Sequence, residues 1–211
     1  MKPLVVKAHL RGALMLPQGP PALDALLMAA IAMRDNLPPL GFGERTEIAI
    51  PLVEARGVYL ASVGQYEAET YERRFLNRKF PMAEAQMLGS SKVRAINIKA
   101  GPAKSYRIPT EMTHLRDDTM TWFATGAEVE VRELLAWITH LGKKRSVGLG
   151  RVDTWTVAPC ETWPGFPVLR DGRPLRPLPL DWPGLGEHRV EPRVLRPPYW
   201  ERWREEACAV A

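Results

Sequence analysis

Glycines and basic residues cluster between positions 142 and 151, in a combination suited to binding an anion. The cluster holds three glycines, a hydroxyl and four cations: Gly142, Lys143, Lys144, Arg145, Ser146, Gly148, Gly150 and Arg151. Glycine lets a backbone approach a ligand closely and adopt positive φ. The exposed N–H groups of such a loop can form an anion-binding nest. A phosphodiester backbone, which is polyanionic, is the ligand this combination fits best.

The spacing of these glycines excludes two nucleotide-binding motifs. A P-loop carries a lysine after its last glycine and lies between a strand and a helix, whereas here Leu149 follows Gly148 and a helix pattern comes first. A dinucleotide fingerprint needs a third glycine three residues after Gly150, where the chain has Asp153. A simpler alternative is a helix C-cap at Gly142 followed by an ordinary basic turn. That alternative does not require Gly148 or Gly150.

A second basic region interleaves aromatic and cationic side chains between residues 65 and 81. Its members are Tyr66, Tyr71, Phe75, Phe80, Arg73, Arg74, Arg78 and Lys79. Aromatic rings beside arginines can stack bases and hold phosphates, as in single-stranded nucleic-acid binders. The alternative is a helix with a buried aromatic stripe and a solvated charged face, because Glu67, Glu69 and Glu72 dilute the charge.

A basic hairpin is predicted from a strand at 92–99, a turn at Gly101-Pro102 and a partner strand at 104–109. Its candidate RNA-binding residues are Lys92, Arg94, Lys104, Tyr106 and Arg107. A hairpin of this charge can reach around a polymer or can be a mere soluble protrusion.

Composition indicates a globular protein of the reducing cytosol. The chain has 211 residues, a net charge of +5 and a pI near 9.4, and 45% of its residues are hydrophobic. Cys160 and Cys208 have no C-x-x-C spacing, which excludes a disulfide framework and a cysteine-rich zinc site. No signal peptide is apparent, and the longest apolar run, at 25–33, is too short to span a membrane. We therefore expect a cytoplasmic protein with no cofactor.

Hydrophobic periodicity predicts the elements that position these clusters. Strands are expected at 4–10, 48–53, 57–63, 119–125 and 152–158. One helix has its apolar stripe at 23–31, and a second has its stripe at 131–141 and ends at Gly142. Without the insertion at about 65–118, the order is strand, helix, strand, strand, helix, strand. That order predicts an α+β, ferredoxin-like (RRM-like) domain over 1–158, with an antiparallel sheet and both helices on one face.

The remaining residues, 159–211, are expected to form a proline-rich extension. Only 168–173 suggests a tight hairpin there. Pro197-Pro198 is predicted to begin a short final helix on which Tyr199, Trp200 and Trp203 share a face.

The element order, the helix end at 134–138 and the loop at 142–152 resemble the RAMP superfamily of CRISPR proteins. The stretch at 100–107 and the compact length are similar to one branch, the "Cas five"-type subunit of type IV effector complexes. The resemblance implies an RRM-like core that holds the 5′ handle of the guide RNA (crRNA) and caps a backbone of "Cas seven"-type subunits. It also implies a large or "Cas eight"-like neighbour, indirect contact with target DNA, no membrane, and a role in antiviral or anti-plasmid defence. The hairpin at 91–109 would correspond to the thumb of that family.

Two other functions fit the sequence less well. A metal-independent RAMP endoribonuclease would use a histidine as general acid or base, with His9, His114, His140 and His188 as candidates. His9 is the most attractive of them, because the first strand also carries Lys7 and Arg11. Such enzymes typically have two ferredoxin-like units, whereas this chain has one such pattern, so we expect no catalytic residues. A DNA-binding regulator lacks the expected helix-turn-helix or zipper pattern, and His140 with Asp153 makes no metal-ligand set.

Overall fold

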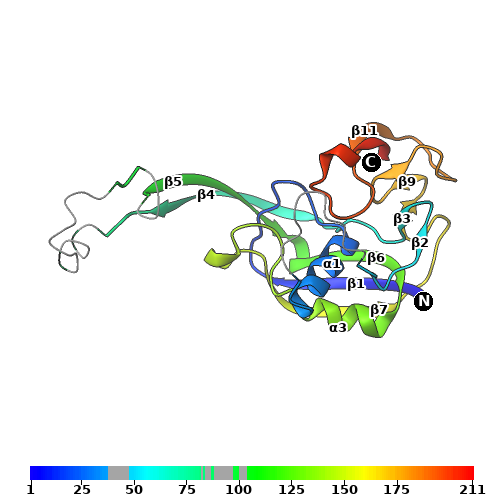
Figure 1. The fold of residues 1–211 in the computed structure, drawn as a ribbon, viewed down its shortest axis with the longest axis horizontal. Coiled ribbons are helices and arrows are strands. Elements are labelled where there is room, and N and C mark those ends of the chain that lie inside the picture. The colour runs from blue at the N-terminus through cyan, green and yellow to red at the C-terminus, as the bar shows by residue number, and fades with distance from the viewer. Residues whose placement is uncertain (38–47, 82, 84–86, 88–96, 100–103) are drawn as a thin grey trace.

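The computed structural model describes residues 1–37, 48–81, 83, 87, 97–99 and 104–211. At its centre lies a three-stranded antiparallel sheet in the order β6–β1–β7 (Figure 1). The strands are β1 (Lys2–Arg11), β6 (Thr119–Gly126) and β7 (Arg151–Pro159). Val6 of β1 lies opposite Trp122 on one side and Val157 on the other. The strands predicted at 4–10, 119–125 and 152–158 are thus confirmed.

Residues 52–65 run along the free edge of β6 without forming a long strand. Isolated bridges join them to β6 at Leu52–Gly126, Ala61–Ala124 and Gln65–Thr121. Between the bridges the chain turns back through the short pair β2 (Glu54–Ala55) and β3 (Val58–Tyr59). The longer strands predicted at 48–53 and 57–63 are therefore wrong in extent. Pro51 has no N–H to donate to a ladder, which favours this interruption.

Two helices of the described chain, α1 (Leu23–Arg34) and α3 (Glu128–Leu135), share one hydrophobic core with the sheet. The buried side chains of β1 alternate along the strand, as the period of two requires, and meet Leu27 of α1 and Leu135 of α3 in that core. The helix predicted to end at Gly142 is shorter, because α3 ends at Leu135. Residues 139–141 pair instead with the start of β7, where the Val152 N–H donates to the Thr139 carbonyl over 2.9 Å.

A long hairpin of β4 (Ala68–Arg78) and β5 (Tyr106–Leu115) extends from one end of the core (left in Figure 1). The predicted pairing of 104–109 with 92–99 is wrong, since Arg107 and Tyr106 lie opposite Asn77 and Arg78 of β4. The helical alternative for 65–81 is also wrong, because this segment is largely a strand. Lys92 and Arg94, placed in the predicted hairpin, lie outside the described residues.

The C-terminal residues form a unit of short strands with its own small core. The predicted hairpin at 168–173 is confirmed as β8 (Leu169–Arg170) and β9 (Arg173–Pro174). A second sheet has the order β10 (Leu178–Pro179), β12 (Glu206–Val210), β11 (Arg189–Arg193). The predicted final helix is wrong: a single 3₁₀ turn, η3 (Arg202–Arg204), precedes β12, whose backbone pairs with β11. Val168, Leu178 and Cys208 are buried in the unit's core.

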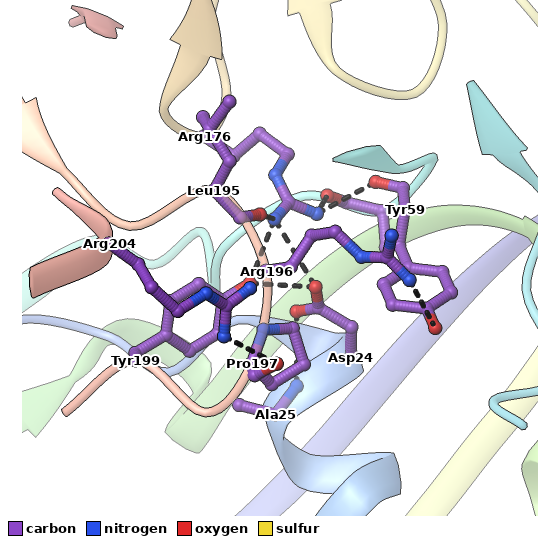
Figure 2. A network of polar contacts seen from close by, with 10 residues as sticks. Asp24, Ala25, Tyr59, Arg176, Leu195, Arg196, Pro197, Tyr199 and Arg204 are labelled. Carbon is purple, nitrogen blue, oxygen red and sulfur yellow. Dashed lines mark hydrogen bonds and ion pairs between the residues drawn. The ribbon is translucent and has the colours of Figure 1, made fainter. Parts of the chain in front are cut away.

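A buried ionic network fastens the C-terminal unit to α1 (Figure 2). Arg176, which is 3% exposed, lies with one guanidinium nitrogen 3.2 Å from the carboxylate of fully buried Asp24. The same nitrogen donates to the Tyr199 hydroxyl over 2.8 Å, and that hydroxyl donates to Asp24 over 2.7 Å. The other terminal nitrogen donates to the carbonyl groups of Tyr59 and Ala61. Burial raises the pKa of Tyr199 well above its usual value, so the phenol remains a donor.

Candidate nucleic-acid interface

The loop that joins α3 to β7, here called the glycine loop (142–150), is closed at its base by close backbone contacts. The Leu141 N–H donates to the Gly150 carbonyl over 2.7 Å. A Cβ at Gly150 would lie 1.9 Å from the Leu141 carbonyl oxygen, and one at Gly142 would lie 2.4 Å from the Met15 carbonyl oxygen. Both glycines also have positive φ. At these two positions, the close approach that glycine permits is therefore to the backbone of the chain itself and not to a ligand.

The tip of the loop uses several of its N–H groups internally. The Val147 N–H donates to the Lys144 carbonyl over 3.1 Å, and the Gly148 N–H donates to the Arg145 carbonyl over 2.9 Å. Lys144 and Gly148 both take left-handed backbone angles around the 3₁₀ turn η2 (Arg145–Val147). A Cβ at Gly148 would meet nothing within 4 Å. Side-chain charge, more than a nest of N–H groups, is therefore what this loop offers to an anion.

The cations of the glycine loop, together with Arg151 at the start of β7, are accessible to a ligand. Lys143, Arg145 and Arg151 are exposed and Lys144 is half-buried, while Ser146 is exposed between them. Within the described residues, none of these four cations is paired with a carboxylate within 4.0 Å. A cationic side chain without a carboxylate partner is free to neutralise a phosphate.

The segment after β1 connects the glycine loop to the base of the hairpin. Leu14 exchanges two hydrogen bonds with Thr113 of β5, at 3.0 and 2.8 Å. On its other side, the Met15 carbonyl accepts from the Lys143 N–H and the Ala13 carbonyl accepts from the Gly150 N–H, each over 2.9 Å. Residues 13–15 therefore hold the loop and the hairpin base together. No pattern in the sequence indicates this contact, because it joins segments about 100 residues apart.

One face of the hairpin combines aromatic and cationic side chains. The strand alternation places Tyr71, Arg73 and Phe75 on this face, and the Arg107 guanidinium lies 4.1 Å from the centre of the Phe75 ring. Tyr71 is 77% exposed and Phe75 is 48% exposed. This is the combination that stacks bases and holds phosphates in single-stranded nucleic-acid binders.

The structure separates residues that the sequence analysis had grouped together. Arg74 lies on the other face of β4, where it forms an ion pair of 2.5 Å with Glu72. Its hydrogen bond lowers the pKa of Glu72, so the carboxylate stays charged and Arg74 stays neutralised at neutral pH. Tyr106 follows the same alternation away from Arg107, and Lys104 is exposed just before β5.

The four histidines do not gather into one site. His9 lies between the hydroxyls of Thr119 and Thr156, at 3.3 and 3.4 Å. His114 is near Glu72, while His140 and His188 contact Thr139 and the Gly186 carbonyl. Among the described residues, no three His, Cys, Asp or Glu side chains form a group that could hold a metal ion.

A groove of about 1130 Å³ is lined by residues of the glycine loop, α1 and the C-terminal unit. Lys143 and Arg145 line it from the glycine loop, and Trp200 and Arg202 line it from the C-terminal unit. Trp200 was expected on a final helix, and no role was predicted for Arg202. An aromatic and a basic residue so close together in the sequence could have indicated a nucleic-acid contact. Their place in the groove could not be predicted, because it depends on how the C-terminal unit packs on the core.

Comparison with protein families identifies the group to which the chain belongs. The model of the family described as CRISPR type IV associated protein Csf3 matches residues 61–210. The match covers the hairpin, the glycine loop and the C-terminal unit, which is most of the chain. The chain therefore belongs to the Csf3 family and is a type IV CRISPR subunit. No curated protein matches the sequence significantly. None of the described helices has the length and apolar character to cross a membrane.

Proposed function

We propose that the chain binds the 5′ handle of the guide RNA in a type IV CRISPR complex. The observation that carries this proposal is the set of backbone hydrogen bonds by which residues 13–15 connect the glycine loop to the hairpin base. Through it, the cations of the glycine loop lie beside the base of the projecting hairpin, one face of which carries Phe75 and Arg107. Family membership supplies the context, since a CRISPR complex is built on an RNA guide. A guide RNA is a polyanion with exposed bases, which phosphate-binding cations and stacking aromatics suit.

The fold we propose is a ferredoxin-like core of the RAMP type, close to the "Cas five" branch. The neighbour order supports it: the 52–65 segment, β6, β1 and β7 follow one another, with α1 after the first strand and α3 before the last. The β4–β5 hairpin is inserted between the second and third strands of that order. In this position it would act as a thumb that reaches the neighbouring "Cas seven"-type subunits. A large or "Cas eight"-like subunit would complete the assembly, with target DNA bound through the guide.

The proposed role is to hold the RNA without cutting it. A processing nuclease of this superfamily would need a histidine supported by a lysine or tyrosine. Within the described chain, the four imidazoles instead contact Thr hydroxyls, a carboxylate or a backbone carbonyl. His9 remains the test case for the nuclease alternative, because it lies on the same strand as Lys7 and Arg11.

The experiment that tests this function compares two labelled guide RNAs, one with its 5′ handle and one without it. The purified chain in chelator should bind the handle-bearing RNA more tightly, by about tenfold or more, and leave it intact. Equal affinities would refute handle recognition. Metal-independent cleavage that His9→Ala abolishes would establish the nuclease instead.

A further inference from the structure

The groove lined by the glycine loop, α1 and the C-terminal unit is rich in basic side chains. Six Lys or Arg side chains line it, against the two carboxylates of Glu191 and Glu205. Three of the six are already engaged: Arg176 with Asp24, Arg193 with Glu191, and Arg189 with Glu191 and the Ala211 carbonyl. Three remain without a carboxylate partner in the described chain, namely Lys143, Arg145 and Arg202.

The free cations reach the groove from two different parts of the chain. Lys143 and Arg145 belong to the glycine loop, whereas Arg202 belongs to η3 of the C-terminal unit. The groove is also lined by apolar side chains of α1, including Leu26 and Met33. A groove that combines cations with apolar side chains suits a single strand, because its phosphates and its bases need different surroundings.

An aromatic side chain lines the groove from the C-terminal unit. Trp200 lines the groove and is 63% exposed, so its indole ring is available for stacking. Trp203 is 54% exposed but does not line the groove. The backbone here is fixed, because the neighbouring Tyr199 is locked in the buried network with Asp24 and Arg176 (Figure 2). A ring on a fixed backbone loses little conformational freedom when a base stacks on it.

We propose that this groove holds a stretch of single-stranded RNA between the glycine loop and the C-terminal unit. In this arrangement a base stacks on Trp200, and Arg202 neutralises a phosphate of the same strand that Lys143 and Arg145 contact. The inference rests on the proposed RNA-binding function and deepens it. It makes the C-terminal unit part of the binding site, in agreement with the reach of the family match to residue 210.

The test measures binding of fluorescein-labelled guide RNA to the full chain at several salt concentrations. Trp200→Ala should weaken binding about tenfold, since stacking on an aromatic ring contributes about 1–3 kcal/mol per base. Trp200→Phe keeps a ring and should stay within about threefold of the parent. Arg202→Gln should lower the salt slope by about one unit. The matched controls, Trp203→Ala and Arg173→Gln, lie outside the groove and should bind as the parent does.

The loop and groove variants together distinguish failure of the groove inference from failure of RNA binding as a whole. If Trp200→Ala and Arg202→Gln bind RNA like their controls while alanine at Lys143, Lys144 and Arg145 weakens binding, the groove inference is wrong and the RNA-binding function stands. If the loop substitutions also change nothing, both fail. Normal RNA binding with lost association to a neighbouring subunit would make the groove a protein-docking surface and overturn the inference.

Discussion

Gly142, Gly148 and Gly150 look equivalent in the sequence, yet the structure gives them different roles. Gly142 and Gly150 are needed where the chain passes close to the carbonyl groups of Met15 and Leu141. Gly148 lies in open space, and its only requirement is a φ of +86°. A loss of RNA affinity in a Gly150 variant could therefore come from a damaged fold as well as from a lost RNA contact.

A comparison of Gly150→Ala with Gly148→Ala separates these roles. Gly150→Ala should reduce the free energy of unfolding by about 2–5 kcal/mol, because positive φ costs about 1–2 and overpacking about 1–3. Gly148→Ala should cost only about 1–2 kcal/mol. Urea unfolding of both variants gives the two values. Equal losses would show that the Leu141 contact does not constrain the loop.

The sequence could predict that this stretch needs glycine and carries positive charge, since both follow from residue type. It could not predict which glycine faces the chain and which faces solvent. For Gly142 that distinction depends on Met15, whose carbonyl reaches the loop from a segment more than 120 residues earlier. The same limit explains why Arg74 was grouped with Arg73, although Glu72 neutralises it.

At the scale of elements, the hairpin has two chemically different faces. Arg73, Phe75 and Arg107 share one face, while Arg74 is paired with Glu72 on the other. Arg73→Ala should weaken guide-RNA binding several-fold and lower the salt slope by about one unit, whereas Arg74→Ala should have little effect. Both residues are exposed, so we expect the stability of each variant to change by no more than about 0.5 kcal/mol. RNA titration and thermal unfolding check both points, and equal losses of affinity would contradict the assignment of faces.

Alternation of buried and exposed residues predicted the three core strands well, because one face of each packs on the helices. The hairpin strands lack that signal, since most of their side chains are exposed on both faces. Without a buried face, periodicity does not specify strand register or partner. This is why 104–109 was paired with the wrong segment. The final helix failed for a related reason: Trp200 and Trp203 are exposed, so their spacing reports no helical core.

At the scale of the whole molecule, one buried ion pair joins regions about 150 residues apart in the chain. Arg176→Met should leave the Asp24 carboxylate buried without its cation, which typically costs about 3–5 kcal/mol. Replacing both partners, as in Asp24→Leu with Arg176→Met, should cost less than Arg176→Met alone. Glu54→Gln, which removes an exposed pair with Arg196, should cost at most about 1 kcal/mol. Urea unfolding measures all three, and a loss of less than about 1 kcal/mol in Arg176→Met would refute the fastening role.

The central claim is that the glycine loop binds RNA through its cations. The most direct measurement is the salt dependence of guide-RNA affinity for the parent and for the variant with alanine at Lys143, Lys144 and Arg145. A control variant with alanine at Lys2, Arg132 and Arg173 removes the same charge elsewhere on the surface. We predict that the loop variant loses about two to three units of slope and most of its affinity, while the control keeps both. An unchanged slope in the loop variant, or an equal loss in the control, would contradict the claim.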